Sequence, residues 1–228
     1  MWDTEIIKYL FWNVFNNPSE CDDVNFGINI KKFSLSTNDR DTKREELGLA
    51  TDDYVILSVG ELIERKNHEV VLKALSQLKK RNKLNNIQYI ICGRGVCADD
   101  LQDMAKRLDI ADHVSFLGYR NDISIICSCA DAFVFMSYQE GLPVALMEAM
   151  ASGLPVICSE IRGNVDLIQH RENGIFAEND PVNVAESILL YCSDIDLRNR
   201  CAKKAVEDIK KYDVSTISNA IKKIYLEI

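Results

Sequence analysis

Six short apolar runs at regular spacing constrain the fold more than any other feature of this sequence. The runs are rich in β-branched and aromatic residues: YVILSV (54–59), IQYIIC (87–92), HVSFL (113–117), AFVFM (132–136), PVICS (155–159) and GIFA (174–177). Stretches with helical periodicity alternate with them, at 67–81, 99–109, 122–129, 143–152, 163–169 and 181–192. Strands and helices that alternate in this way form βαβ units. The pattern therefore predicts a doubly wound α/β fold around a parallel sheet.

The two ends of the chain follow other patterns. Residues 1–50 hold a candidate helix over 1–20, then VNFGINIKKF, and then the charged run NDRDTKREELGL, which is typical of a solvated helix or a linker. Residues 195–227 keep helical periodicity without another strand, and ISNAIKKIYLEI has the spacing of an amphipathic closing helix. We therefore divide the chain into an N-terminal remnant or linker with a helix and a strand (1–50) and an α/β domain with C-terminal helices (51–228).

Composition and charge exclude several classes of protein. A chain of 228 residues with 47% hydrophobic and 27% charged residues can bury an ample core, as one large domain or two small ones. Its formal net charge of -8 tells against a dedicated nucleic-acid binder, which would be basic. The same total still leaves room for a local cationic pocket that binds phosphate.

Cysteine usage and hydropathy indicate the compartment. The eight cysteines contain no Cys-x-x-Cys pair, and several lie inside apolar runs, which indicates reduced cysteines that pack as small hydrophobes. No apolar run reaches the roughly 20 residues that span a bilayer, and the N-terminus lacks a basic region followed by an apolar one. We therefore expect a cytoplasmic protein.

In open parallel sheets, ligands bind beyond the carboxyl ends of the strands, so the residues after each run are the candidates for a site. After the first run, Gly60 allows close approach of the backbone to a ligand, and Arg65 and Lys66 place two cations next to a helix start. This combination suits a diphosphate, and it also fits a glycine turn followed by a solvated basic pair. His68 is expected at the surface, at the start of that helix.

Two carboxylates mark the stretch SYQEGLPVALMEAMASGLPVICSE (137–160). Pro143 fits the start of a short helix and Gly153 its end, so Glu140 lies in a loop at the ligand edge and Glu148 lies on the helix. Glu148 has two interpretations, a ligand for ribose hydroxyls or a side chain that faces water. Glycoside hydrolases also use two carboxylates, but spacing in sequence does not fix their separation in space.

Taken together, these segments resemble the retaining nucleotide-sugar glycosyltransferases of group 1, family four. The string EGLPVALMEAMASGLPV (140–156) is similar to that family's paired-glutamate signature. The similarity extends, in order, through VNFGINIKKF, ILSVGELIERKNHEVVLKAL, IICGRG, DHVSFLGYRNDISIICSCADAFVFMS, EIRGNVDLI and NGIFAENDP. The resemblance implies a GT-B fold, in which two Rossmann-like domains face each other across a cleft. This chain corresponds to the C-terminal half, with residues 51–228 as the nucleotide-sugar-binding domain.

The resemblance also implies a role for each candidate residue. Glu148 would hold the ribose hydroxyls of a nucleoside-diphosphate sugar, and Glu140 would contact the transferred sugar. Lys66, with the backbone amides of Gly141 and Leu142, would hold the diphosphate. Glu140 and Lys66 are thus the candidate catalytic residues.

Three further residues, Gly118, Tyr119 and Arg120, would lie along the base, which is most often uracil in such enzymes. The chain departs from the family pattern after Gly60, where Glu61 replaces the usual arginine. Arg65 is the residue nearby that could supply the missing charge.

The expected activity is transfer of a hexose with retention, from a UDP-linked donor to a glycan or lipid-linked acceptor, in cell-surface or capsular polysaccharide synthesis. No Asp-x-Asp box follows a suitable strand, so no obligatory metal or other cofactor is expected. The site of action would be the cytoplasm, including the inner face of the membrane.

Only about 50 residues precede the first run, whereas an acceptor-binding domain needs well over about 100 residues. The acceptor half is thus expected from a partner subunit, or is lost. Two alternatives stay open: a non-catalytic nucleotide-sugar-binding subunit or inactive fragment that needs a partner domain, and an unrelated α/β enzyme such as a sugar-nucleotide epimerase.

Overall fold

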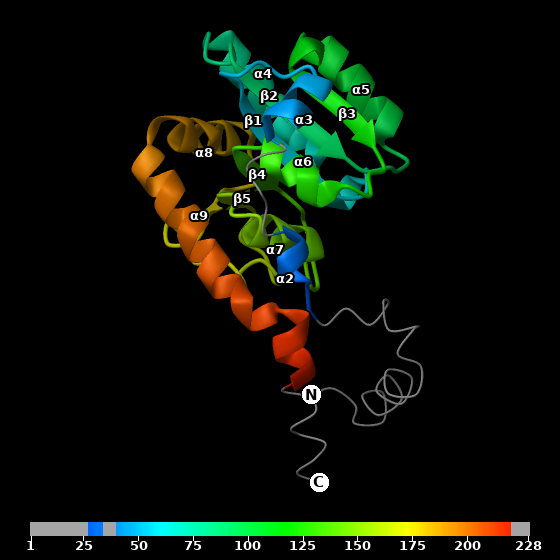
Figure 1. The fold of residues 1–228 in the computed structure, drawn as a ribbon. Helices are drawn as coiled ribbons and strands as arrows, with labels where there is room; N and C mark the ends of the chain where they lie inside the picture. The colour runs from blue at the N-terminus through cyan, green and yellow to red at the C-terminus, as the bar shows by residue number, and fades with distance from the viewer. Residues whose placement is uncertain (1–26, 34–39, 220–228) are drawn as a thin grey trace. The chain divides into compact units, whose positions relative to one another are not determined.

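A computed structural model describes residues 27–33 and 40–219, and the helix expected over 1–20 lies outside these residues. Residues Ile30–Lys210 form one compact unit (Figure 1), and the described residues 27–29 and 211–219 belong to a second. In the second unit, the backbone of Ile28 accepts from Val214 and donates to Tyr212, both at 3.0 Å. Residues 214–219 are helical, while the rest of the expected closing helix lies outside the described part.

The larger unit is built on one parallel sheet of six strands in the order β3-β2-β1-β4-β5-β6. All six predicted strands are confirmed, with ends that differ by at most one residue. Their bounds are β1 Tyr54–Val59, β2 Ile87–Cys92, β3 Val114–Gly118, β4 Ala132–Phe135, β5 Val156–Cys158 and β6 Ile175–Phe176. Because β1 lies in the middle of the order, it is buried along most of its length. The sheet confirms the Rossmann-like doubly wound fold.

Helices cover both faces of this sheet, as the alternating pattern requires (Figure 1). Their bounds are α2 Ile30–Phe33, α3 Arg40–Glu46, α4 His68–Lys80, α5 Ala98–Arg107, α6 Ile123–Cys129, α7 Val144–Ala151, α8 Pro181–Ser193 and α9 Ile195–Ile209. On one face, α4 packs against α5 and α8, and the core there joins Ile56, Tyr89 and Ile91 of the sheet. Elsewhere, α6 packs against α3, and α7 packs against α2 and α9.

One predicted helix is wrong. Residues 163–169 form a series of turns, not a helix. Gly163 has a φ of +92°, which interrupts helical geometry at its first residue. The side-chain amide of Asn164 then donates through Nδ2 to the Ser159 carbonyl oxygen at 2.9 Å, a contact that anchors the segment to the end of β5.

The charged run before β1 forms helix α3, but it is not solvated along its length. The side chain of Arg44 is buried, and the whole residue is 5% exposed. Its Nη1 donates to the Cys129 carbonyl oxygen at 2.9 Å, and its Nη2 donates to that of Ala50 at 3.0 Å. Asp131 supplies the counter-charge, at 2.7 Å from Arg40. The basic residues of the run therefore fasten α3 to the end of α6.

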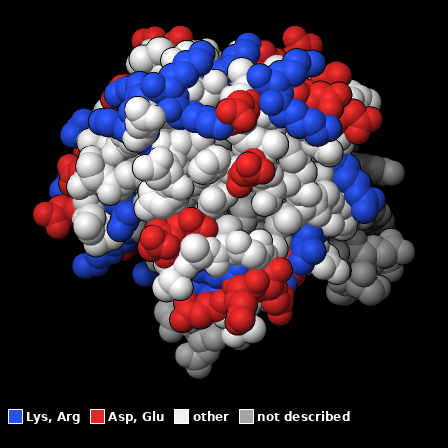
Figure 2. Space-filling view, turned by 90° about the horizontal axis from the view of Figure 1, so that it is seen from above, with Lys and Arg blue, Asp and Glu red and all other residues white. Residues whose placement is uncertain are grey.

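Surface charge, cysteines and helix hydropathy complete the description of the fold. Figure 2 shows one face on which basic side chains gather along an edge, while acidic ones lie in separate groups around a broad uncharged area. Each cysteine in the described part is free, and most of them are buried. None of the helices described is both long and apolar enough to cross a bilayer.

Candidate functional site

The strand order places a crevice between the ends of β1 and β4. The chain leaves β1 toward β2 on one side and leaves β4 toward β5 on the other, so the two loops diverge. One loop carries the short 3-10 turn Glu64–Lys66, and the other leads from β4 into α7. The sequence candidates around Lys66 and Glu140 thus meet at this crevice.

Arg65, Lys66 and Glu140 form a single ion cluster there, although Glu140 is far from the two cations in sequence. Lys66 Nζ lies 2.7 Å from Glu140 Oε1, and Arg65 Nη1 lies 3.4 Å from the same oxygen. Arg65 Nη1 also donates to the Gln139 carbonyl oxygen at 2.7 Å. The Glu140 side chain is only 7% exposed. Two cations and one carboxylate leave one net positive charge for a ligand.

Two neighbours hold Lys66 in place. Its ammonium lies 5.1 Å from the ring centroid of Phe135, the last residue of β4, in a cation–π contact. Its stem passes Gly60, where an added Cβ would lie 3.6 Å from the Lys66 side chain. This distance is an ordinary van der Waals contact, so the lysine stem packs directly beside Gly60.

The loop that follows Glu140 presents backbone amides. Gly141 and Leu142 are exposed, and in the described part of the chain their N–H groups donate to no backbone acceptor. Pro143 then caps helix α7, whose first turn adds its own free amides. Such amides bind anions, because the helix dipole and the N–H groups both favour negative charge.

Gly163 supports this loop from behind. An added Cβ at Gly163 would lie 2.6 Å from the Gly141 carbonyl oxygen and 3.0 Å from that of Glu140. Only glycine permits such close approach at a φ of +92°. Sequence reasoning did not select Gly163, although it is the first glycine after the fifth apolar run, which was a usable signal.

Glu148 lies apart from the ion cluster. Helix α7 is mostly buried, but Glu148 on this helix is only half-buried. The carboxylate makes no hydrogen bond or ion pair with the residues that the structure describes. Desolvation raises the pKa of Glu148, while the charge of Lys32 on α2 lowers it. An ionised carboxylate held this way is available to hydroxyl groups of a ligand.

The residues after β3 form another wall of the site. A cavity of about 280 Å³ lies between Gly60 and the Tyr119–Arg120 segment, with Val59 and Ile123 among its apolar walls. Gly118 ends β3 with a φ of +65°, which turns the chain into this wall.

The charged groups at this wall are already paired. Arg120 makes a bidentate pair with Asp122, at 2.8 and 2.6 Å, so its charge is largely committed. The guanidinium of Arg94 lies 5.7 Å from the ring centroid of Tyr119, a contact that sequence reasoning missed. A flat apolar group such as a base fits beside an exposed tyrosine ring held in this way.

Gly93 and Gly95 bring the loop after β2 close to the loop after β1. An added Cβ at Gly93 would lie 1.8 Å from the Gly60 carbonyl oxygen, and one at Gly95 would lie 2.3 Å from that of Leu62. The loop after β2 therefore lies directly against the loop after β1. Both glycines help to position the loop that carries the ion cluster.

His68 is not a surface residue, contrary to the sequence-based expectation. It is buried at the start of α4, with Nδ1 3.4 Å from the Tyr89 hydroxyl and Nε2 3.3 Å from the Glu61 carbonyl oxygen. Burial lowers the pKa of His68 to about 4, so the ring is neutral at pH 7. Its function is to connect the loop to the core, because both ring nitrogens are engaged.

No set of three or more His, Cys, Asp or Glu side chains gathers as a metal site among residues 27–33 and 40–219. The groups that face the crevice are instead cations, amides and single carboxylates. This chemistry is suited to an anionic, hydroxyl-bearing ligand.

A family model described as "Glycosyl transferases group 1" matches residues 39–208. The chain belongs to this family. Among its relatives, the UDP-Gal:alpha-D-GlcNAc-diphosphoundecaprenol alpha-1,3-galactosyltransferase of Escherichia coli is 27% identical over 217 residues, which cover 94% of this chain and 56% of that protein. An uncharacterized glycosyltransferase of Methanocaldococcus jannaschii is 30% identical over 220 residues, which cover 93% of this chain and 56% of that protein. This group 1 chain thus spans about half the length of these curated relatives.

Solved structures of glycosyltransferases show the same fold. HepE of Anabaena in complex with UDP superposes with a TM-score of 0.82 at 24% identity, over 89% of this chain and 56% of that one. The C-terminal domain of a group 1 protein from Francisella tularensis gives a TM-score of 0.73 at 22% identity, over 82% of this chain and 100% of the other. The group 1 chain therefore has the fold of a C-terminal GT-B half.

Proposed function

We propose that this chain carries the donor site of a family four glycosyltransferase, which transfers a sugar with retention from a UDP-sugar to a hydroxyl group of a glycan or lipid-linked acceptor. The observation that carries the proposal is the ion cluster at the switch point of the sheet, beside the free amides of Gly141 and Leu142. Lys66 and Arg65 supply charge for a diphosphate, and the amides supply directed donors.

Each part of a nucleotide sugar then has a place. The base lies beside Tyr119, in the cavity that Arg120 also lines. The ribose hydroxyls donate to the unpaired carboxylate of Glu148. The diphosphate lies at Lys66, and the sugar lies next to Glu140.

The reaction breaks the bond between the anomeric carbon and a diphosphate oxygen. Negative charge then develops on the leaving diphosphate, where Lys66, Arg65 and the helix amides stabilise it. The acceptor hydroxyl oxygen forms the new bond to the anomeric carbon, and its proton passes to the leaving diphosphate. Because side chains and amides balance this charge, the transfer has no obligatory metal.

The relatives support the choice of nucleotide and acceptor class. The Escherichia coli relative is named for UDP-galactose and a diphosphoundecaprenol acceptor, and a solved structure of HepE contains UDP-glucose. These names support a UDP-sugar donor and a lipid-linked acceptor, and the site of action that we propose with them is the cytoplasm, including the inner face of the membrane. Synthesis of surface polysaccharide is the corresponding process.

One observation favours a second candidate, a binding subunit that acts only with a partner domain. Five large hydrophobic side chains are exposed on the loops that follow β2, β3, β4 and β5: Val96, Tyr119, Tyr138, Leu142 and Val165. Exposed apolar side chains at one edge are typical of a surface that another domain covers. On this candidate, the chain alone binds nucleotide sugar and transfers little.

Calorimetric titration with UDP, UDP-glucose and UDP-galactose tests the donor site. Wild type is expected to bind, while Lys66→Ala and Glu148→Ala each weaken binding by about tenfold or more, as expected when a charged hydrogen-bond partner is lost. Lys106→Ala is the matched control, because Lys106 pairs with Asp103 on the open surface of α5. Absence of binding by wild type would refute the donor site. Efficient transfer by the chain alone would refute the binding-subunit candidate.

A further inference from the structure

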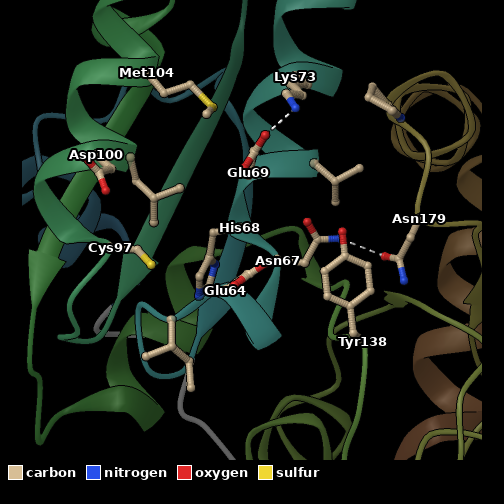
Figure 3. A pocket seen from close by; sticks show the side chains of 14 residues that line it. Glu64, Asn67, His68, Glu69, Lys73, Cys97, Asp100, Met104, Tyr138 and Asn179 are labelled. Atoms are coloured by element: carbon tan, nitrogen blue, oxygen red, sulfur yellow. Dashed lines mark hydrogen bonds and ion pairs between the residues drawn. The ribbon is translucent and has the colours of Figure 1, made fainter.

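A second cavity lies next to the ion cluster, between α4, α5 and the loops after β1, β4 and β6 (Figure 3). Its volume is about 380 Å³, which is within the range of small-molecule sites. We call it the α4–α5 pocket. The ion cluster does not line this pocket, but the loops after β1 and β4 contribute residues to both the cluster and the pocket. Glu64 and Asn67 come directly before and after the two cations, and Tyr138 lies two residues before Glu140.

A pair of side-chain amides lies on one wall of the pocket. Asn67 Nδ2 donates to Asn179 Oδ1 at 3.0 Å, and the two side chains meet beside Tyr138 in Figure 3. Asn67 is 7% exposed, and in the described part of the chain no donor reaches its Oδ1. Because each amide has a donor end and an acceptor end, the pair keeps one acceptor on Asn67 and one donor on Asn179 for a ligand.

An aromatic ring and two carboxylates complete the polar lining. Tyr138 is 55% exposed, and its backbone N–H donates to the Arg65 carbonyl oxygen at 2.9 Å, which ties the backbone of this residue to the loop after β1. Glu64 and Asp100 line the pocket without an ion-pair partner among the described residues. A pyranose ring has an apolar C–H face that packs on an aromatic ring and hydroxyls that pair with amides and carboxylates.

The charge of the pocket excludes an anionic ligand. Three carboxylates line it, those of Glu64, Glu69 and Asp100, against the single cation Lys73. Lys73 is itself paired with Glu69, as the dashed line in Figure 3 shows. A phosphate or a uronic acid would therefore meet net negative charge, which opposes binding. His68 adds no charge at neutral pH, because its pKa is lowered.

We propose that the α4–α5 pocket binds one uncharged sugar unit of the glycan on which the enzyme acts, at a place separate from the donor nucleotide. This assignment rests on the proposed function, because it takes the glycan to be the molecule that is extended. The sugar stacks on Tyr138, and its hydroxyls pair with Asn67, Asn179 and the free carboxylates. Since the pocket and the ion cluster share both loops, the bound glycan approaches the crevice next to Glu140.

Saturation-transfer NMR with methyl glycosides tests the pocket. The probes are methyl α-D-glucopyranoside, methyl α-D-galactopyranoside and the methyl glycoside of N-acetylglucosamine at millimolar concentration, with methyl glucuronide as the charged counterpart. At least one neutral glycoside is expected to bind wild type and Tyr138→Phe. Tyr138→Ala and Asn179→Ala weaken that binding by about tenfold, the effect of losing a central contact. Asn183→Ala, an exposed asparagine on α8, is the matched control and keeps full binding.

UDP binding, measured on the same samples, separates this inference from the proposed function. Tyr138→Ala and Asn179→Ala are expected to bind UDP as wild type does, which also shows that they are folded. If UDP binds while no neutral glycoside does, or if both alanine variants keep the glycoside signals, the pocket assignment is wrong and the donor site stands. Equal binding of the glucuronide would overturn the charge argument. If glycosides bind and UDP does not, the donor site fails instead.

Discussion

Acid is expected to destabilise this chain through one residue, His68. The ring is buried at the start of α4, so a charged imidazolium there would lose its hydration in the folded state. Burial, with a smaller contribution from the nearby charge of Lys66, lowers its pKa from an ordinary value of 6.5 to about 4. The loop that carries the ion cluster begins at the contact of His68 with the Glu61 carbonyl oxygen.

The size of the effect follows from the two pKa values. Above pH 6.5 the ring is neutral in both the folded and the unfolded chain, so His68 costs nothing. Below pH 6.5 the unfolded chain takes up the proton and the folded chain does not, so stability falls as pH falls. At pH 5 the loss is about 2 kcal/mol, and it approaches about 3 kcal/mol below pH 4, at 1.36 kcal/mol per pKa unit.

Urea unfolding followed by circular dichroism at pH 7.5, 6 and 5 measures this loss. Wild type should lose about 2 kcal/mol more than His68→Gln between pH 7.5 and 5, because glutamine does not titrate. Titrating carboxylates contribute equally to both proteins, so the difference isolates His68. The matched control, His170→Gln, replaces an exposed histidine and should follow wild type. The reasoning is refuted if His68→Gln loses as much stability as wild type over this range.

Three further predictions concern the site and its loops. Glu148→Gln should stabilise the unliganded chain at pH 7 by about 1 kcal/mol, or roughly 2–4 °C in Tm, because a raised pKa means that the ionised carboxylate costs stability there. Calorimetry should show this gain together with weaker UDP binding, and an unchanged Tm would contradict it. Gly93→Ala should destabilise by more than about 3 kcal/mol in urea unfolding, since its Cβ would overlap the Gly60 carbonyl oxygen, whereas Gly118→Ala, with open space, should lose only about 1–2 kcal/mol from its positive φ. UDP affinity should be the same with and without EDTA, and a loss of more than about tenfold with EDTA would contradict metal-free binding of the diphosphate.

The sheet could be predicted because its strands depend on the local pattern of apolar residues. The meeting of the loops after β1 and β4 could be predicted because it follows from a general rule of parallel sheets. Each strand shows as an apolar run, and in a parallel sheet the carboxyl ends share one edge. Lys66 and Glu140 were therefore expected at the same crevice, and the 2.7 Å ion pair confirms that they meet. That each holds its expected part of a nucleotide sugar stays a prediction.

Features that depend on three-dimensional neighbours could not be predicted. The segment 163–169 has helical spacing, but its conformation depends on the approach of Gly163 to the Glu140–Gly141 loop. Arg44 looked solvated because a sequence does not show which carbonyl groups at the end of α6 lack partners. His68 was expected at the surface because it is polar. The sequence does not show that the Tyr89 hydroxyl and the Glu61 carbonyl group provide polar partners for it inside the protein. The α4–α5 pocket has no sequence motif at all, since helices and loops that are far apart in the sequence contribute to it.

The carboxylate of Glu140 also determines how a nucleotide sugar arrives. It neutralises one of two neighbouring cations before any ligand is present, and the chain as a whole has a net charge of -8. Long-range attraction for a diphosphate is therefore weak, and we expect an association rate constant that changes little with ionic strength. Selectivity for the donor then resides in the dissociation rate. The ion cluster positions the lysine for close contact and does not steer the ligand from a distance.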